Sequence, residues 1–394
     1  MKGEMNQMAS EAATISPAVE AANTLTARWC ARLGNEDFVV SGAGLWPLLA
    51  LLASAADETA RVELAAALGR HAESGQSDAL ELIGILRDGV STTAALGLWT
   101  RKGIPLREEW ASVLPAGVVG TLTDQGALDR WASERTGGLI DKFPLEITSE
   151  TVLVLASALA ARVKWRTPFD ARPRNGDWDS TEPDQQWLSR RTYDLGIAAV
   201  LDGTVTRVVV EGDGDIDVYL LLGDQQPSDV LAAGLSELSG AARVSPATDP
   251  DSGGPGLTVR RVQSSRPQDV LHLRLPSFQI AERHDLLEHK DLFGLRALTD
   301  PYVSHLPLLS PVELSISQGA QGVLARFFAE GFEAAAVTAF GAIPTGGRPI
   351  ESYEITVVEA DFDQPFGFIA VHRPSRLAVV AGWVNGPFQE GSQE

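Results

Sequence analysis

The sequence offers few residues whose types and spacing could carry out chemistry. His284 and His289 flank Asp285-Leu286-Leu287-Glu288, and two histidines with carboxylates nearby are a familiar metal-binding combination. Their spacing of five residues, however, points them to different faces of a helix, whereas chelation on a helix uses spacings of three or four. The pattern therefore predicts a charged, solvated helix over 284–289 and no metal site there.

A second group of acidic residues resembles a calcium-binding loop. The run Asp213-Gly214-Asp215-Ile216-Asp217 alternates acidic and other residues, as such loops do. Val218 nevertheless stands where the loop requires glycine, and no Glu closes it. We interpret the run as a hairpin turn that leads into a strand at 218–222.

Motifs of known catalytic sites are missing from the sequence. It contains no Gly-x-Ser-x-Gly, no His-Glu-x-x-His, no phosphate-binding loop and no paired-cysteine motif. The sequence therefore predicts a protein that is not an enzyme and that uses no metal or cofactor, with an enzyme as the weaker alternative.

The long segment after Glu333 is the most informative feature of the chain. No charged residue follows until Arg348, yet the run 341–347 contains three glycines and a proline, which disfavour a regular helix. Small side chains suit a segment that is exposed in one state and buried as a strand in another. An Ala-rich helix followed by a loop is the alternative, and the segment alone leaves both interpretations open.

The pattern of apolar runs and turn residues predicts an α+β fold. Helical spacing dominates up to about residue 90, and strands prevail after 193, which favours an antiparallel-rich sheet with helices packed on it. The run 152–161 is apolar throughout, as expected of a central strand covered on both faces. We expect strands over 38–41, 94–100, 152–161, 198–201, 207–210, 218–222, 270–275 and 312–316, a helix over 107–114 and a flexible connector over 246–255.

Composition limits the classes of partner. The net charge of −20 opposes nucleic acids and anionic membranes, and no cluster of basic residues suggests a heparin site. Cys30 is the single cysteine, so it cannot form an internal disulfide. The N-terminus has no apolar core of signal-peptide length, and the apolar runs 45–56 and 152–163 are too short to span a membrane. By these features the sequence favours a cytoplasmic location.

Six blocks, in the same order along the chain, resemble the serpin family in its bacterial-type, inhibitory form. The segment 330–339 also resembles the serpin hinge and the start of its reactive-centre loop. The six blocks are Phe38-Val39-Val40-Ser41 with Leu48–Leu52, Asp57-Glu58-Thr59 with Leu68-Gly69, Trp131–Ile140, Thr151–Phe169, Leu273–Phe278 and Phe362–Pro387.

The resemblance implies one large unit with a serpin fold. This fold has a large central, mostly antiparallel sheet, smaller sheets, about eight or nine helices and an exposed reactive-centre loop. We expect a polar leader over 1–20, a single domain over 21–388 with the loop at about 331–356, and a tail over 389–394. Family resemblance favours the extracellular space over the cytoplasm, so the location stays open.

The resemblance also implies a function in which the partner supplies the chemistry. A serine, or alternatively a cysteine, protease cleaves the loop and forms a covalent acyl-enzyme, and the freed loop inserts as a strand into the main sheet. The chain would act as a monomer on an elastase- or subtilisin-like protease. The alternative is a non-inhibitory serpin that acts as a binding, chaperone or storage module.

Position in the family pattern assigns the loop residues. The scissile bond is expected at Thr345–Gly346, and Arg348 is the rival that would indicate a trypsin-like protease. Phe332 departs from the family, whose inhibitory members carry Thr or Ser there, and a bulky residue would slow insertion unless a cavity receives it. The expected hinge consists of Glu330, Gly331, Phe332, Glu333, Ala334, Ala335, Ala336, Val337 and Thr338.

A further set of residues is expected where the sheet opens. Ser41 matches the family, whereas Ser157 replaces a usual Asn and Gln321 a usual His, so we expect a Ser41–Ser157–Gln321 network. Gly44 stands where the family has a second Ser. Trp165 matches the family's Trp at the end of the sheet where the loop begins to insert.

Overall fold

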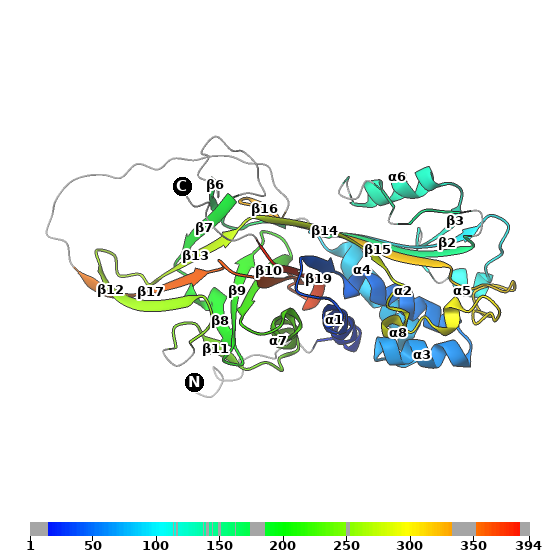
Figure 1. Cartoon of the computed structure of the whole chain (residues 1–394), viewed down its shortest axis with the longest axis horizontal. Coiled ribbons are helices and arrows are strands. Elements are labelled where there is room, and N and C mark those ends of the chain that lie inside the picture. Colours follow the sequence, from blue (N-terminus) through cyan, green and yellow to red (C-terminus); the bar gives the residue numbers. More distant parts are fainter. Residues whose placement is uncertain are drawn as a thin grey trace, which may run out of the picture.

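The computed structural model describes residues 15–112, 114–115, 117–136, 138, 142–143, 145–148, 151–161, 163–173, 186–249, 253–332 and 352–386. Within these residues, three larger sheets and eight α-helices form an elongated α+β molecule (Figure 1). The α-helices are α1 (Pro17–Cys30), α2 (Gly42–Ala55), α3 (Glu58–Leu68), α4 (Gly75–Asp88), α5 (Glu108–Ala111), α6 (Gln125–Thr136), α7 (Pro227–Ser239) and α8 (Lys290–Phe293).

Short polar residues begin the first helices. The Ser16 hydroxyl accepts a hydrogen bond from Val19 N at 3.2 Å, and Pro17 occupies the first helical position of α1. Asp57 caps α3 in the same way, and Gly69 ends it in the left-handed conformation (φ 65°) that glycine adopts without strain. Since α1 begins at Pro17, it includes the last four residues of the leader expected over 1–20.

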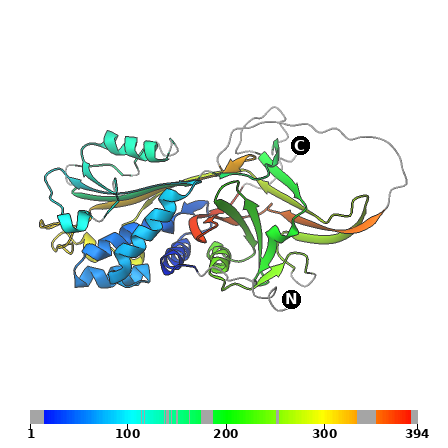
Figure 2. The same cartoon turned by 180° about the vertical axis from the view of Figure 1, so that it is seen from behind.

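A five-stranded sheet, which we call the central sheet, runs along the molecule in the order β14-β15-β4-β2-β3. Helix α6 lies over one face, and α2 and α4 lie against the other (Figures 1 and 2). The pairs β14–β15 and β2–β4 are antiparallel, whereas β15–β4 and β2–β3 are parallel. Its strands are β2 (Thr92–Arg101), β3 (Val119–Leu122), β4 (Leu153–Ala161), β14 (Phe278–Asp285) and β15 (Gln318–Phe327).

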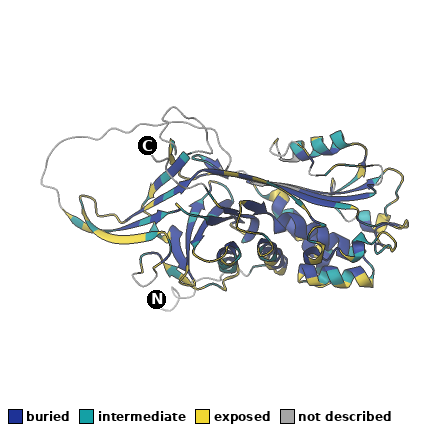
Figure 3. Cartoon of the chain, in the orientation of Figure 1, coloured by how far each residue is buried: buried dark blue, intermediate teal, exposed yellow. Residues whose placement is uncertain are grey.

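A seven-stranded sheet contributes part of the aromatic core. It is antiparallel throughout, in the order β1-β19-β18-β10-β9-β8-β11, and its inner strands are buried (Figure 3). Phe366 and Phe368 of β18 are fully buried. The strands are β1 (Phe38–Val40), β8 (Ala198–Leu201), β9 (Val205–Glu211), β10 (Ile216–Gly223), β11 (Val244–Pro246), β18 (Phe366–His372) and β19 (Leu377–Val384).

A third sheet has the order β12-β17-β13-β7-β6, and its edge strand β12 is largely exposed (Figure 3). Its strands are β6 (Asp170–Pro173), β7 (Gln186–Thr192), β12 (Leu257–Ser264), β13 (Val270–Pro276) and β17 (Tyr353–Asp361). Two short strands, β5 (Val163–Lys164) and β16 (Gly331–Phe332), pair with each other. The 3₁₀ helices are Ala72–Ser74, Leu195–Ile197 and Ala297–Thr299.

Most strands expected from the sequence are confirmed, but three predicted elements are not. The helix over 284–289 is wrong, because His284 belongs to β14, where pairing with β15 overrides the helical pattern. The strand over 312–316 is also wrong. Leu314 and Ile316 are buried in an extended segment whose amides bond to Ser304 Oγ and Leu298 O instead of a neighbouring strand. The helix over 107–114 shortens to α5.

Candidate functional site

The contact between β15 and β4 is the feature on which the site depends, and we call it the β15–β4 seam. The two strands pair in parallel from Gln318↔Val154 to Val323↔Leu159, in the middle of the central sheet. Residues 319, 320 and 322 of β15 are glycine or alanine. Parallel pairing is slightly less stable per residue than antiparallel pairing, and small residues bury little area across it. The seam is therefore the weakest central contact of this sheet.

One buried hydrogen-bond network crosses the seam below the sheet. Gln321 Nε2 donates to Ser157 Oγ at 2.9 Å and to Ser41 O at 2.8 Å, and Ser41 N donates to Gln321 Oε1 at 2.9 Å. The Ser41 hydroxyl donates to Val379 O at 2.6 Å and accepts from Gly44 N at 2.9 Å, so it also caps α2. The structure thus brings together the three residues expected to form a network, and all three are buried.

Gly44 leaves the room that this network needs. A Cβ at this position would lie 3.2 Å from Ser41 Oγ, 3.3 Å from Ser157 Oγ and 3.4 Å from Gln321 Nε2. Such contacts are tighter than most Cβ atoms tolerate, so a side chain here would crowd the amide of Gln321. Gly44 thus leaves the Gln321 amide free to bond to both Ser41 and Ser157.

At one end of the seam the chain reverses direction and begins a new strand. After β15 ends at Phe327, Phe328 N donates to Gly331 O at 2.9 Å, which closes a tight turn. Strand β16 then pairs antiparallel with β5, with Gly331 opposite Lys164 and Phe332 opposite Val163. Because β5 follows β4 after a single residue, β16 runs against the direction shared by β15 and β4.

Gly331 is required by the closeness of this pairing. A Cβ added there would lie 2.2 Å from Val163 O and 3.2 Å from Lys164 Cα, distances that no side chain can occupy without moving the backbone. The glycine that the sequence places at the start of the hinge is therefore the residue that allows β16 to approach β5.

Trp165 packs at the end of the central sheet where β15 turns into β16. Its indole Nε1 donates to Phe328 O at 2.9 Å, and its backbone N donates to Glu330 O at 3.0 Å. The ring is buried against Phe169 and Phe327, with centroid distances of 6.3 Å and 4.6 Å. Trp165 thus lies at the end of the central sheet and bonds to both arms of the turn that leads into β16.

The rest of the expected loop lies outside the described residues. This applies to Glu333, Ala334, Ala335, Ala336, Val337 and Thr338 of the hinge and to Thr345, Gly346 and Arg348. Of Phe332 the structure describes the backbone pairing only. The roles of all these residues therefore stay predictions.

His284 is a neighbour of the network that sequence reasoning missed. It lies opposite Gln321 in the β14–β15 pairing, and its Nε2 is 2.8 Å from Val39 O. Its ring also packs edge-on against Trp29 at 5.1 Å. Burial lowers the pKa of His284 below its usual value, so the ring is neutral at pH 7. A signal existed in the alternating apolar residues Phe278 and Ile280, which indicate a strand that runs on to residue 284.

Other groups with chemical potential lie away from the seam. Burial raises the pKa of the Cys30 thiol to about 12, so it is not a thiolate nucleophile at neutral pH. In the described part of the chain, no cluster of three or more His, Cys, Asp or Glu could hold a metal ion. None of the helices among the described residues has the length and apolarity to cross a membrane.

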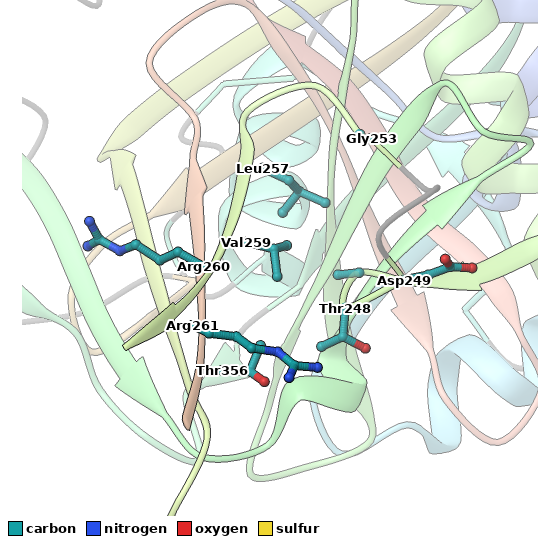
Figure 4. A pocket seen from close by; sticks show the side chains of 10 residues that line it. Thr248, Asp249, Gly253, Leu257, Val259, Arg260, Arg261 and Thr356 are labelled. Atoms are coloured by element: carbon teal, nitrogen blue, oxygen red, sulfur yellow. The ribbon is translucent and has the colours of Figure 1, made fainter. Parts of the chain in front are cut away.

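A surface pocket of about 390 Å³ lies between β12 and the connector that precedes it. Leu257, Val259 and Arg261 line it together with Thr248 and Thr356, whereas the Arg260 side chain points to the other side of the strand (Figure 4). It combines an apolar floor with one cationic group, but it is separate from the seam.

Comparison with known proteins agrees with this architecture. Residues 18–186 match the family described as Serpin (serine protease inhibitor). Alaserpin of Manduca sexta is 23% identical over 300 residues, which are 71% of this chain and 70% of that protein. The putative serpin-Z8 of Oryza sativa subsp. japonica is 23% identical over 389 residues, which are 89% of this chain and 86% of that protein.

Solved structures share the fold at low identity. Tengpin, a thermophilic serpin in its native state, superimposes with a TM-score of 0.68 at 16% identity over 94% of both chains. Human thyroxine-binding globulin complexed with thyroxine gives 0.67 at 16% identity, over 94% of this chain and 98% of that one. Serpins are in general protease inhibitors rather than enzymes, with proteases as their partners. The family match over residues 18–186, the relatives that extend along the sequence and the shared architecture show that this chain is similar to serpins and has the serpin fold.

Proposed function

We propose that this chain inhibits a serine protease by suicide cleavage of the loop that follows β16. The protease attacks the loop, forms an acyl-enzyme, and is carried along as the loop inserts between β15 and β4. A cysteine protease, which forms the analogous thioester, is the alternative target. The observation that carries the proposal is the antiparallel pairing of β16 with β5, because a strand that continued from Phe332 would run antiparallel to both β15 and β4.

Insertion would replace one weak contact by two stronger ones. The parallel seam of six register pairs would be exchanged for two antiparallel ladders, each strand satisfying its backbone groups on both sides. Roughly a dozen additional ladder hydrogen bonds at about 1 kcal/mol net each supply on the order of 10 kcal/mol. This gain is the driving force for displacing the protease. Until cleavage, the five-stranded state is held kinetically.

Strand alternation assigns the residues of the inserting segment to two faces. Phe332, Ala334, Ala336 and Thr338 would face the core, and Glu333, Ala335 and Val337 would face solvent. Four alanines among the first eight residues after Gly331 suit insertion into a packed sheet. Phe332 is the bulky exception and would limit the rate.

The network at the seam would act as the latch of the sheet. The bond from Gln321 to Ser157 is the one side-chain hydrogen bond described here that joins β15 directly to β4, so it must break when the strands separate. Its bonds to Ser41 stay on the side of β15 and α2 and need not change.

The scissile bond proposed from the family pattern is Thr345–Gly346. A small β-branched residue fits the shallow pocket of elastase- and subtilisin-like proteases better than an Arg- or Phe-specific pocket. Mixing the chain with subtilisin-, trypsin-, elastase- and chymotrypsin-like proteases should therefore give an SDS-resistant adduct with at least one. The mass of the released C-terminal peptide should place its start at Gly346; a peptide that starts at Pro349 would assign the bond to Arg348 and a trypsin-like target.

A binding or storage module without inhibition is the second candidate, and the pocket beside β12 is the observation that favours it. A melting experiment separates the two functions. If the loop inserts after cleavage, about 10 kcal/mol raises the melting temperature of a chain of this length by on the order of 10 °C. Clean cleavage without adduct, and without a rise in melting temperature, would favour the binding module.

A further inference from the structure

The turn between β9 and β10 contacts the residues just before β2 and the short strand β5 that follows β4. This turn, residues 212–215, lies beside the last residues of β5 on one side and the start of β2 on the other. Strands β2 and β4 pair along nine register positions, from Thr92↔Ala161 to Thr100↔Leu153, so they move as one unit. The β9–β10 turn therefore meets that unit at the end of the sheet where the hinge begins to insert.

Asp215 forms the contact with β2. Its Oδ2 accepts a hydrogen bond from Val90 N at 2.7 Å, and its Oδ1 accepts one from Ser91 N at 3.0 Å. Burial alone would raise the pKa of Asp215, but the hydrogen bonds from Val90 and Ser91 hold it below its ordinary value, so the carboxylate is charged at neutral pH. Both oxygens are thus engaged by backbone N–H groups immediately before β2 begins.

The same turn and the end of β9 are hydrogen-bonded to β5 and to the residues that follow it. Asp213 N donates to Lys164 O at 2.9 Å, and Arg166 N donates to Glu211 O at 3.0 Å. The Arg166 and Glu211 side chains form an ion pair at 2.8 Å. Gly212 also forms an isolated bridge with Trp165.

Arg373, in the turn between β18 and β19, holds the β9–β10 turn rigid. Its guanidinium donates to both oxygens of Asp217, at 2.7 Å and 2.6 Å, and to the carbonyls of Gly214 and Gly212, at 3.0 Å and 3.2 Å. Its backbone N donates to Asp215 O at 2.8 Å. A planar group bonded at four acceptors has little freedom, so the turn is a fixed part of the seven-stranded sheet.

We propose that the β9–β10 turn is the pivot of sheet opening, and that Asp215 is the positioning residue that holds the β2–β4 unit there while the rest of β4 swings away from β15. The inference rests on the proposed function, and it assigns to Asp215 a role in loop insertion.

The place where the β15–β4 pairing stops favours a pivot at this end over a contact that must break before the strands separate. The β15–β4 ladder stops at Val323↔Leu159, whereas β15 continues to Phe327 and β16 already pairs with β5. The two halves of the sheet are therefore already apart where the turn grips them. Separation of β15 from β4 has to spread from this end toward the pair Gln318↔Val154. A fixed attachment at the β16 end keeps β5 in the position where β16 pairs with it.

The test compares two aspartate-to-asparagine substitutions in neighbouring hairpin turns. In Asp215→Asn one of the two N–H groups loses its acceptor and faces an amide NH₂, because an asparagine offers a single oxygen. Asp202 in the β8–β9 turn accepts one backbone bond, from Arg243 N at 2.9 Å, which an asparagine oxygen can keep. Asp202→Asn is therefore the matched control.

The measurement is the rate at which the melting temperature of the loop-cleaved chain reaches its final value, together with the moles of chain consumed per mole of protease inhibited. We expect Asp215→Asn to slow insertion about tenfold, the size of one lost hydrogen bond to a charged group, and to raise the consumption ratio. Asp202→Asn should match the wild type in both.

Other results would contradict either the pivot or the proposed function. If Asp215→Asn inserts as fast as the wild type, or faster, the turn is not a pivot, although the proposed function stands. If the cleaved wild type shows no rise in melting temperature, the proposed function fails and the pivot fails with it. Gly214→Ala is the second variant, because its Cβ would lie 2.3 Å from Ser91 Oγ and push β2 from the turn; it should slow insertion as well.

Discussion

The β15–β4 seam and the pairing of β10 with β18 lie in the middle of two sheets of the same molecule, yet they are built differently. Strands β10 and β18 pair antiparallel from Ile216↔His372 to Leu221↔Gly367, and the fully buried Phe366 and Phe368 lie on β18. Strands β15 and β4 pair in parallel, with Gln321 opposite Ser157 and small residues around them. Separating the first pair would expose large apolar side chains, at about 25 cal/mol per Å², whereas separating the second exposes little. Position in a sheet does not decide which strands can part; direction and side-chain size do.

The largest effect should come from a charge on the core face of the inserting segment. Ala336→Arg would bury an unpaired guanidinium against the central sheet, at a cost of several kcal/mol. Cleavage should continue while the SDS-resistant adduct disappears. Ala335→Arg places the same charge on the solvent face and should retain the adduct, and equal loss in both variants would refute the assignment of faces.

A side chain at Gly331 should have the next largest effect. Gly331→Val would place a Cβ 2.2 Å from Val163 O, so β16 could not pair with β5 without a backbone shift that costs about 1–3 kcal/mol. We expect a lower adduct yield with the uncleaved melting temperature little changed. Gly34→Val serves as control because nothing lies within 4 Å of its Cβ position, and a wild-type adduct yield from Gly331→Val would show that β16 is not needed.

Removing the latch should weaken the seam without touching the β10–β18 pairing. Ser157→Ala deletes the acceptor of the bond from Gln321 and should lower the stability of the uncleaved chain by about 1 kcal/mol. It should also speed insertion, because that bond breaks when the strands part. Ser310→Ala removes a buried hydroxyl bonded to Pro105 O away from the seam, so it should lower stability and leave the insertion rate unchanged. Equal rates for the two variants would contradict the latch.

Replacing Phe332 should have a smaller effect, and it should make inhibition more efficient instead of less. Phe332→Thr should relieve crowding at the first residue of the inserting segment and reduce the moles of chain consumed per mole of protease inhibited. A reduction of up to about tenfold corresponds to about 1.4 kcal/mol, which lies within the roughly 1–3 kcal/mol that overpacking costs. An unchanged ratio would mean that the central sheet already has a cavity for the phenyl ring.

The smallest effect should be a pH dependence of the uncleaved chain from His284. Its pKa lies below the unfolded value because burial disfavours the cation, so between the two values the unfolded chain binds the additional proton. Its contribution to stability is complete above about pH 6.5 and is lost as the pH falls below that value. Carboxylates Glu282 and Glu288 oppose this lowering and His289 adds to it. His284→Gln should flatten the melting temperature between pH 7.5 and 5; an unchanged slope would assign the dependence to other groups, such as His372, whose pKa is also lowered by burial.

The sequence predicts the frame of this molecule better than its moving parts. The short apolar runs within β4, β8, β9 and β10 predict buried strands, and the structure has strands at these places. The segment 312–316 alternates apolar and polar residues but bonds to loops, because a buried extended segment has the same pattern whether or not a strand lies beside it. The helix predicted over 284–289 is wrong for a related reason, since the pairing of His284 with β15 decides its conformation.

The site shows a similar division. Ser41, Ser157 and Gln321 are far apart in the sequence, so residue types and spacing alone do not predict their contact. The resemblance to a known family predicted the network, and the structure shows its hydrogen bonds. The attachment of Asp215 to the start of β2 left no sequence signal, because its two hydrogen bonds to Val90 and Ser91 use backbone N–H groups, which every residue type except proline provides.

A crystal structure of the loop-cleaved chain tests the central claim most directly. We predict a new strand that begins at β16 and runs between β15 and β4, antiparallel to both, so that the pairs Gln318↔Val154 to Val323↔Leu159 no longer exist. The β10–β18 register should be unchanged, from Ile216↔His372 to Leu221↔Gly367. A cleaved chain that keeps β15 paired directly with β4 would contradict loop insertion, and with it the inhibitory function proposed for this protein.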